Sequence, residues 1–172
     1  MYLGFLLLLF HWQSQAWGKF KNILPNTPGY TCTASCPEGW KQHGQHCYLW
    51  NSKYLAWSAA EEFCNNREGH LASVATKETN MFLYNWTRTK TTSEKFWIGG
   101  SDKITEGEWT WTDGSPMNYT NWGTEEPSET DWLGRQEDCL TIDLRDGTWN
   151  NKVCDTFSHT KQSVCSQRLC PG

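Results

Sequence analysis

The stretch KFWIGG, residues Lys95 to Gly100, divides the chain into two kinds of sequence pattern. Before it, apolar residues recur at helical spacing. After it come short β-prone pieces, GEWTWTDG, CLTIDL and SVCSQ, separated by Gly, Asp and Asn turns. Because helices come first and strands later, this order predicts an α+β fold.

The segment LAWSAAEEFCNN, residues 55–66, is predicted to be the first helix. Leu55, Ala59 or Ala60, and Phe63 share one face at i, i+4, i+8 spacing, and that face is expected to be buried. The opposite face carries the acids at 61 and 62 and is expected to meet water.

The segment TKETNMFLYNW, residues 76–86, is predicted to be the second helix. It begins at Thr76, a candidate N-cap, and places Glu78 in the first turn, where the helix dipole favours an acid. Met81, Phe82 and the residues 84–86 are expected to supply its buried side.

No regular period holds between Trp111 and Cys139, which predicts a long irregular loop of the kind that is usually functional or ligand-stabilised. Its second half, EEPSETDWLGRQEDC, is acidic, and TWNNKVC follows shortly after. Because neighbouring acids repel each other, a cation is expected to offset them. The alternative is a charged loop that water alone solvates.

The N-terminal stretch MYLGFLLLLFHWQSQAWG predicts a signal peptide over residues 1–18. Nine apolar residues, Tyr2–Phe10, precede the small-x-small triplet Ser14-Gln15-Ala16. A membrane anchor is the alternative, but nine residues cannot cross a hydrocarbon core of ~30 Å. No later stretch is apolar enough, so the chain is predicted not to span a membrane. Residues 19–35, which contain prolines, are interpreted as an N-terminal arm.

Composition narrows the function classes. The 172 residues suit one domain, and a net charge of −4 argues against nucleic acid as a partner, because nucleic-acid binding needs a basic surface. No nucleophile motif or metalloprotease signature is present, so the chain is predicted not to be an enzyme. The 12 tryptophans serve either the core or a binding surface.

The eight cysteines indicate four disulfides if the chain is secreted, although the count alone allows about 105 pairings. The stretch HGQHC raises the alternative of zinc, but no Cys-x-x-Cys pair accompanies it. Two sequons, at Asn85 and Asn118, predict glycosylation of a secreted glycoprotein.

Four motifs together resemble the C-type lectin domain family: CPEGWKQHGQHCY, FWIGGSD, NWGTEEPS and TWNNKVC. The resemblance covers nearly the whole stretch from Cys36 to Cys165 and places a lectin domain over residues 36–170. It implies a C-type lectin-like fold with two helices, small antiparallel sheets, a long calcium-binding loop and disulfide staples. The proportions resemble soluble, single-domain lectins of fish and venoms.

By position, the resemblance implies the disulfides Cys36–Cys47, Cys64–Cys165 and Cys139–Cys154. Cys32 and Cys170 remain, at chain ends that lie close together in this fold, and a bond between them within the chain is favoured. The alternative is a pair of interchain bridges that would hold a homodimer.

The resemblance also implies a primary, sugar-bridging calcium ion held by five residues, Glu126, Ser128, Glu137, Asn150 and Asn151. Pro127 fits the cis proline that the family places between the first two. Two vicinal sugar hydroxyls would coordinate the metal and bond the same side chains. Two departures weaken this site: the family's triplets are Glu-Pro-Asn or Gln-Pro-Asp, and its Trp-Asn-Asp is here Trp-Asn-Asn. With two carboxylates in place of three, weaker calcium binding is expected.

An auxiliary calcium ion is implied at Asp102, Glu106, Glu129 and Asp138, where it would order the loop without touching sugar. Trp132 is a candidate for stacking on a sugar ring. The sugar stays open between mannose or fucose type and galactose type.

The expected function is that of a secreted, calcium-dependent lectin for glycans or glycoproteins, with a role in innate defence or mucus. The alternatives keep the fold but bind protein, as venom and receptor relatives do, or ice, as type II antifreeze proteins do.

Overall fold

The structure is a computed structural model that describes residues 32–170. The predicted signal peptide and residues 19–31 of the predicted arm lie outside the described residues. Neither helix of the described part is long and apolar enough to cross a membrane. The elements, in chain order, are β1 (Cys32–Thr33), β2 (Lys41–His43), β3 (His46–Leu55), α1 (Trp57–Asn65), β4 (His70–Leu71), α2 (Lys77–Thr87), β5 (Lys95–Ser101), β6 (Thr110–Trp111), β7 (Cys139–Asp143), β8 (Trp149–Lys152) and β9 (Lys161–Leu169).

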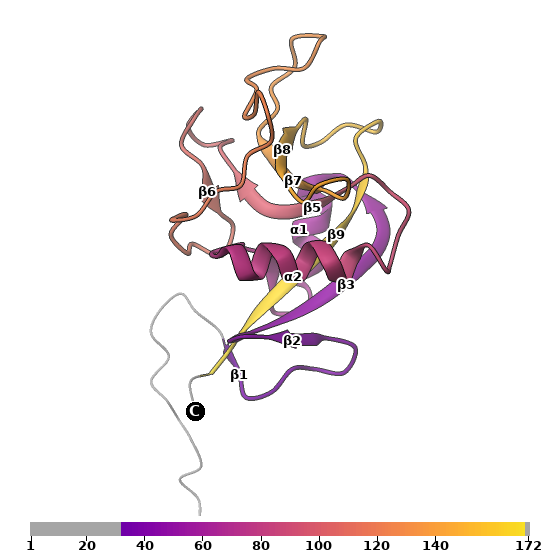
Figure 1. Cartoon of the computed structure of the whole chain (residues 1–172), viewed down its shortest axis with the longest axis vertical. Coiled ribbons are helices and arrows are strands. Elements are labelled where there is room, and N and C mark those ends of the chain that lie inside the picture. Colours follow the sequence, from indigo (N-terminus) through magenta and orange to yellow (C-terminus); the bar gives the residue numbers. More distant parts are fainter. Residues whose placement is uncertain (1–31, 171–172) are drawn as a thin grey trace, which may run out of the picture. The chain divides into compact units, whose positions relative to one another are not determined.

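All strands of the described part join one sheet, whose main order is β2-β3-β9-β5-β7-β8 (Figure 1). Strand β9 connects its two halves, because it pairs antiparallel with β3 on one side and parallel with β5 on the other. β1 and β4 also pair with β9, and β6 pairs with β5. The predicted α+β, C-type lectin-like fold is confirmed, and the small sheets that the resemblance implied are connected through β9.

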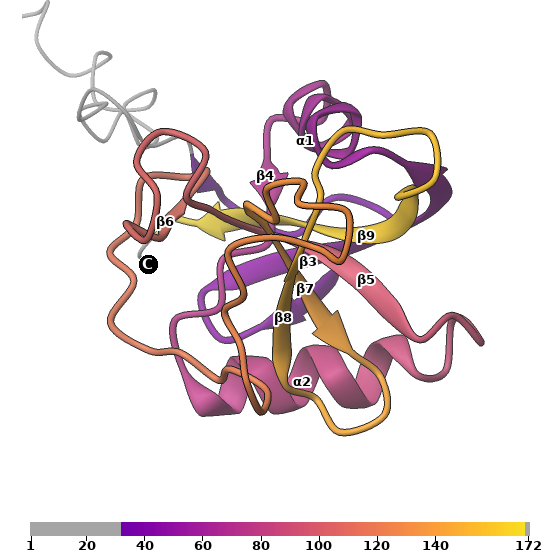
Figure 2. The same cartoon turned by 90° about the horizontal axis from the view of Figure 1, so that it is seen from above.

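The two helices lie on opposite sides of the central strands (Figure 2). Helix α1 buries Trp57, Ala60 and Cys64 in a cluster with the disulfide of β9. The predicted face is therefore rotated about the helix axis: of the two alternatives Ala60 is buried and Ala59 is exposed, and Leu55 and Phe63 are only partly buried at the edge of this cluster.

Helix α2 begins as predicted, because the Thr76 hydroxyl accepts a hydrogen bond of 3.1 Å from Thr79 N. Its buried residues, however, are Asn80, Leu83 and Thr87. The prediction for Met81 was wrong, since this side chain is 45% exposed. The aromatic residues at 82, 84 and 86 are half-buried.

Two glycines in β5 allow neighbouring elements to approach closely. A Cβ on Gly99 would lie 2.4 Å from the carbonyl oxygen of Leu71, and one on Gly100 would lie 2.2 Å from Leu140 Cδ1. The stretch that separates the helical from the strand pattern therefore crosses the centre of the sheet, where there is no room for a side chain on these two residues.

Four disulfides close the described part, and no free cysteine remains within it. They join the pairs that the resemblance implied, together with a bond between Cys32 and Cys170 within the chain. This last bond, with the parallel pairing of β1 and β9, places residues 32–33 in the sheet rather than in a separate arm.

Candidate ligand site on the long loop

The long loop is attached to β8 along residues 121–123. Trp149 N donates to Asn121 O at 2.7 Å, and Gly123 N donates to Trp149 O at 2.8 Å. Trp122 packs edge-on against the buried ring of Trp149. Because this attachment precedes the acidic stretch, the residues that follow it lie beside the asparagines of β8. Figure 1 shows the loop in salmon to orange on the side of β6, β7 and β8.

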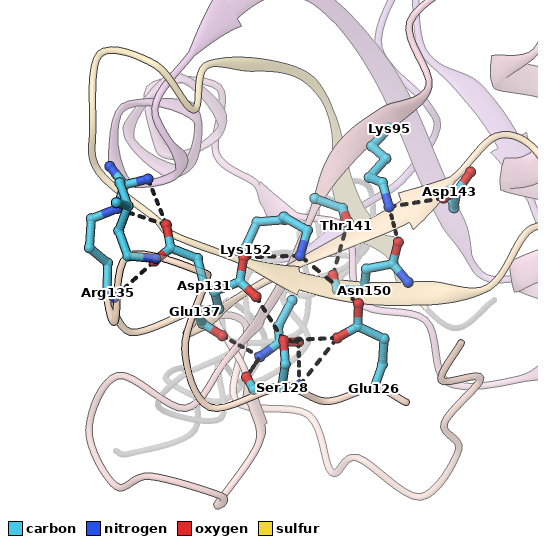
Figure 3. A network of polar contacts seen from close by, with 12 residues as sticks. Lys95, Glu126, Ser128, Asp131, Arg135, Glu137, Thr141, Asp143, Asn150 and Lys152 are labelled. Carbon is cyan, nitrogen blue, oxygen red and sulfur yellow. Dashed lines mark hydrogen bonds and ion pairs between the residues drawn. The ribbon is translucent and has the colours of Figure 1, made fainter. Parts of the chain in front are cut away.

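The primary cluster comprises the five predicted ligands of the first calcium ion, Glu126, Ser128, Glu137, Asn150 and Asn151. The peptide bond between Glu126 and Pro127 is cis, as expected. The hydroxyl of Ser128 donates to Glu137 Oε2 at 2.7 Å and lies 3.2 Å from Glu126 Oε2. Both carboxylates therefore meet at one serine (Figure 3).

The two asparagines of β8 take different partners. Asn151 is 1% exposed; its Oδ1 accepts from Ser128 N at 3.0 Å, and its amide group donates to the carbonyl oxygens of Ser128 and Glu137. Asn150 is turned toward Lys95, whose ammonium donates to Asn150 Oδ1 and pairs with Asp143 at 2.9 Å. The structure thus joins four of the five predicted ligands and directs the fifth elsewhere.

Lys152 is the residue that the sequence analysis missed. It follows Asn151 in β8, and its Nζ lies 2.9 Å from Glu137 Oε1 and 3.9 Å from Glu126 Oε1 (Figure 3). The signal was present in TWNNKVC, where a cation adjoins the asparagines. The cation that offsets these acids in the structure is a lysine.

The primary cluster does not fit a bridging calcium ion. Ca²⁺ takes six to eight oxygen ligands at about 2.3–2.6 Å, with carboxylates to balance its charge. Here each carboxylate faces the Lys152 ammonium, the Ser128 hydroxyl donates to Glu137, and the amide oxygens of both asparagines accept from protein donors. No side-chain oxygen of this cluster is both buried and without a partner.

The auxiliary cluster, Asp102, Glu106, Glu129 and Asp138, is of a different kind. Asp102 N donates to Asp138 O at 3.2 Å, so these two residues are adjacent. Burial, with a further contribution from Asp138, raises the pKa of Asp102. Partial desolvation and then the charges of Asp102, Asp138 and Glu129 raise the pKa of Glu106. None of the four carboxylates forms an ion pair with a residue in the range 32–170.

The auxiliary cluster contains one orphaned acceptor that a hard cation would satisfy. Asp102 is 4% exposed and its Oδ1 is buried without a hydrogen-bond partner, although Gly107 N donates to Oδ2 at 3.0 Å. Within residues 32–170, no three Asp, Glu, His or Cys side chains converge closely enough to hold a metal ion as they stand. Main-chain carbonyls and water commonly complete calcium coordination in such loops.

The remaining predicted residues lie at the surface. Trp132 is 87% exposed, in a turn whose flanking residues Asp131 and Arg135 form an ion pair of 2.6 Å. Asn85 on α2 and Asn118 in the loop are both exposed, so both sequons are accessible. Their glycosylation and the stacking role of Trp132 stay predictions.

Comparison with known proteins gives a consistent result. The model of the lectin C-type domain matches residues 53–167. The galactose-specific lectin nattectin of Thalassophryne nattereri is 34% identical over 138 residues, which cover 80% of this chain and 83% of nattectin.

Two solved structures are similar in fold as well as in sequence. The carbohydrate-recognition domain of the mouse scavenger receptor C-type lectin has a TM-score of 0.66 and 30% identity, over 80% of this chain and 99% of that one. A calcium-independent type II antifreeze protein has a TM-score of 0.67 and 31% identity, over 79% and 96% of the two chains.

Proposed function

This chain belongs to the C-type lectin domain family, and we propose that it is an extracellular protein that binds glycans at the primary cluster. Four disulfides support an oxidising, extracellular location. Nattectin, a galactose-specific relative of similar length, supports carbohydrate as the ligand class.

The observation that carries this proposal is the meeting of acceptors and a donor at an accessible point of the loop. The side chains of Glu126 and Lys152 are 15% and 25% exposed, and Glu137 and Ser128 lie directly against them. Carboxylate oxygens accept from sugar hydroxyls and an ammonium donates to them. Hydrogen bonds to charged groups are the stronger class, which suits a ligand that offers only neutral hydroxyls.

Trp132 supports the same proposal from the long loop. Its exposed indole offers an apolar face, and sugars present such faces on one side of the ring. We assign it to stacking on a sugar ring of the glycan.

Calcium has its place in this proposal at the auxiliary cluster. Asp102, Glu106, Glu129 and Asp138 would hold the ion, which would supply the positive charge that the residues of this cluster lack. The calcium ion would not contact the glycan, which binds at the primary cluster.

A glycan array of galactose-, mannose- and fucose-terminated structures tests the proposal. The wild-type protein is expected to retain one class, and Glu126→Gln is expected to reduce retention about tenfold or more by removing a charge-assisted acceptor. Glu108→Gln, an exposed acid outside the primary cluster, serves as the matched control. Equal retention by the two variants would show that the primary cluster does not bind the sugar.

Ice binding is the second candidate, and the likeness to a calcium-independent type II antifreeze protein favours it. Exposed apolar side chains at Ile104, Leu133 and Phe157 are compatible with a weakly hydrated surface. Thermal hysteresis of the purified protein, in the absence of any retained glycan, would replace the first proposal with this one.

A further inference from the structure

Lys152 supplies the positive charge of the primary cluster. Glu137 is 6% exposed, so its carboxylate is largely removed from water and requires a counter-charge or hydrogen-bond donors. The ammonium 2.9 Å from Oε1 and the Ser128 hydroxyl 2.7 Å from Oε2 satisfy both of its oxygens. The same ammonium reaches Glu126 Oε1 at 3.9 Å, so one lysine bridges two carboxylates.

Two further lysines, Lys95 and Lys161, lie near β8. Lys95 lies at Asn150 and Asp143, and Lys161 lies with its Nζ 4.7 Å from the centre of the Trp97 ring. Burial, followed by the charges of Lys152 and Lys95, lowers the pKa of Lys161 to about 8. The charges of Lys152 and Lys95 are therefore felt at Lys161.

We propose that the Lys152 ammonium takes the place of a bridging metal ion, so that the primary cluster binds its ligand without a divalent cation. Glu126 and Glu137 contribute two negative charges and Lys152 one positive charge, while the serine and the asparagines are neutral. The ligand then meets a carboxylate–ammonium–carboxylate row. The ligand part of this inference rests on the proposed function, whereas the metal part does not.

The half-exposed position of Lys152 gives it a second role toward the ligand. The ammonium has three N–H groups, and the contacts with Glu137 and Glu126 use at most two of them. The third donates to an oxygen of the ligand, such as a sugar hydroxyl.

A calcium titration tests the metal part independently of any ligand. It is done on the Asp102→Asn protein, in which the auxiliary cluster has lost a carboxylate while the side chain keeps its size. We expect no calcium binding by calorimetry in this background. Adding Lys152→Met is expected to bring calcium binding into the measurable range, at least about tenfold above the detection limit, because the two carboxylates then lack their counter-charge. Lys152→Arg, which keeps the charge, is expected to bind none.

The inference is overturned if the Asp102→Asn protein binds calcium and Glu126→Gln removes that binding, because the metal would then occupy the primary cluster beside Lys152. It is equally overturned if Lys152→Met and Lys152→Arg behave alike. Far-UV circular dichroism of each variant verifies folding. Should Lys152→Met not fold, the titrations of the Asp102→Asn protein with and without Glu126→Gln still decide the question.

The ligand part of the inference is tested with the glycan class that the wild-type protein retains on the array. Retention is expected to persist with EDTA and to fall about tenfold or more in Lys152→Met. Lys103→Met is the control, because the Lys103 ammonium pairs with Asp155 at 2.7 Å and is not part of the primary cluster. Retention that EDTA abolishes in the Asp102→Asn protein, in which the auxiliary cluster has lost a carboxylate, contradicts the inference. If no glycan is retained in any condition, the proposed function fails, and the calcium titration alone decides the role of Lys152.

Discussion

Asn80 is a buried polar residue that joins helix α2 to the strand carrying the ligand asparagines. It is 2% exposed; its Oδ1 accepts from Trp149 Nε1 at 2.7 Å, and its Nδ2 donates to Gly147 O at 2.9 Å. Gly147 lies in the β7–β8 connection and Trp149 begins β8, so one side chain fixes the helix against the strand from which the site is built.

We predict that Asn80→Ala lowers the free energy of unfolding by roughly 2–4 kcal/mol, because it leaves the buried indole N–H of Trp149 unpaired and opens a small cavity. Gly147 O loses one of its two donors and keeps the other, Asn121 Nδ2 at 2.8 Å. Chemical denaturation measures this change. Met81→Ala, at an exposed position of the same helix, is the control and is expected to change it by about 0.5 kcal/mol or less. Equal losses in the two variants would contradict the role given to Asn80.

At this scale, the sequence predicts residue types better than contacts. The acids and amides of the loop were identified from TWNNKVC and EEPSETDWLGRQEDC together with the family resemblance. The role of Lys152 was not, because a lysine in a strand gives no sign of how far its flexible side chain reaches or which oxygen it meets. The orphan oxygen of Asp102 likewise depends on packing around the end of β5.

Strand β5 packs closely against other elements, because Gly99 and Gly100 present no side chain to Leu71 of β4 and Leu140 of β7. The hydrogen bond from Gly99 N to Ala72 O, 2.9 Å long, and that from Thr112 N to Gly99 O, also 2.9 Å, run past a residue that has no space for a Cβ.

Gly99→Ala is expected to destabilise the protein more than Gly100→Ala. The new methyl group at 99 meets a backbone oxygen, that of Leu71 at 2.4 Å, which cannot move without displacing β4. The methyl group at 100 meets the Leu140 side chain, which can change rotamer. Overpacking of this kind costs roughly 1–3 kcal/mol. Thermal melting compares the two variants, and the reverse order of melting temperatures would refute this explanation.

The helices show why faces are harder to predict than elements. Both helices were located from their periodicity, and the cap at Thr76 from its residue type. The buried face of α1 is fixed by Cys64, which is bonded to Cys165, and that of α2 includes Asn80 and Thr87, whose polar groups find partners. A search for apolar spacing passes over both features.

At the scale of the whole molecule, the disulfide between Cys32 and Cys170 closes almost the entire described part, with a sequence separation of 138. This disulfide was predicted from the family resemblance, which leaves these two cysteines at chain ends that lie close together. The number of cysteines alone did not predict it. The connection of the small sheets through β9 was not predictable from local pattern, because it depends on strands far apart in the sequence.

This bond predicts a monomer on a non-reducing gel for the wild-type protein. The double variant Cys32→Ser/Cys170→Ser is expected to stay folded through the other three disulfides and to lose on the order of 3–5 kcal/mol, since the denatured chain gains freedom. Denaturant titration measures the loss. A covalent dimer in the wild type that the double variant abolishes would instead indicate interchain bridges.

Two unlike acidic clusters lie at the long loop: Lys152 offsets one, and we propose calcium for the other. The most direct test is the melting temperature with EDTA and with millimolar CaCl₂ for the wild type, Glu126→Gln and Asp102→Asn. Calcium at about ten times its dissociation constant adds about 1.4 kcal/mol, which is a rise of roughly 3–6 °C for a domain of this size. We predict this rise for the wild type and Glu126→Gln and its loss in Asp102→Asn. A rise that survives in Asp102→Asn and disappears in Glu126→Gln would contradict the account.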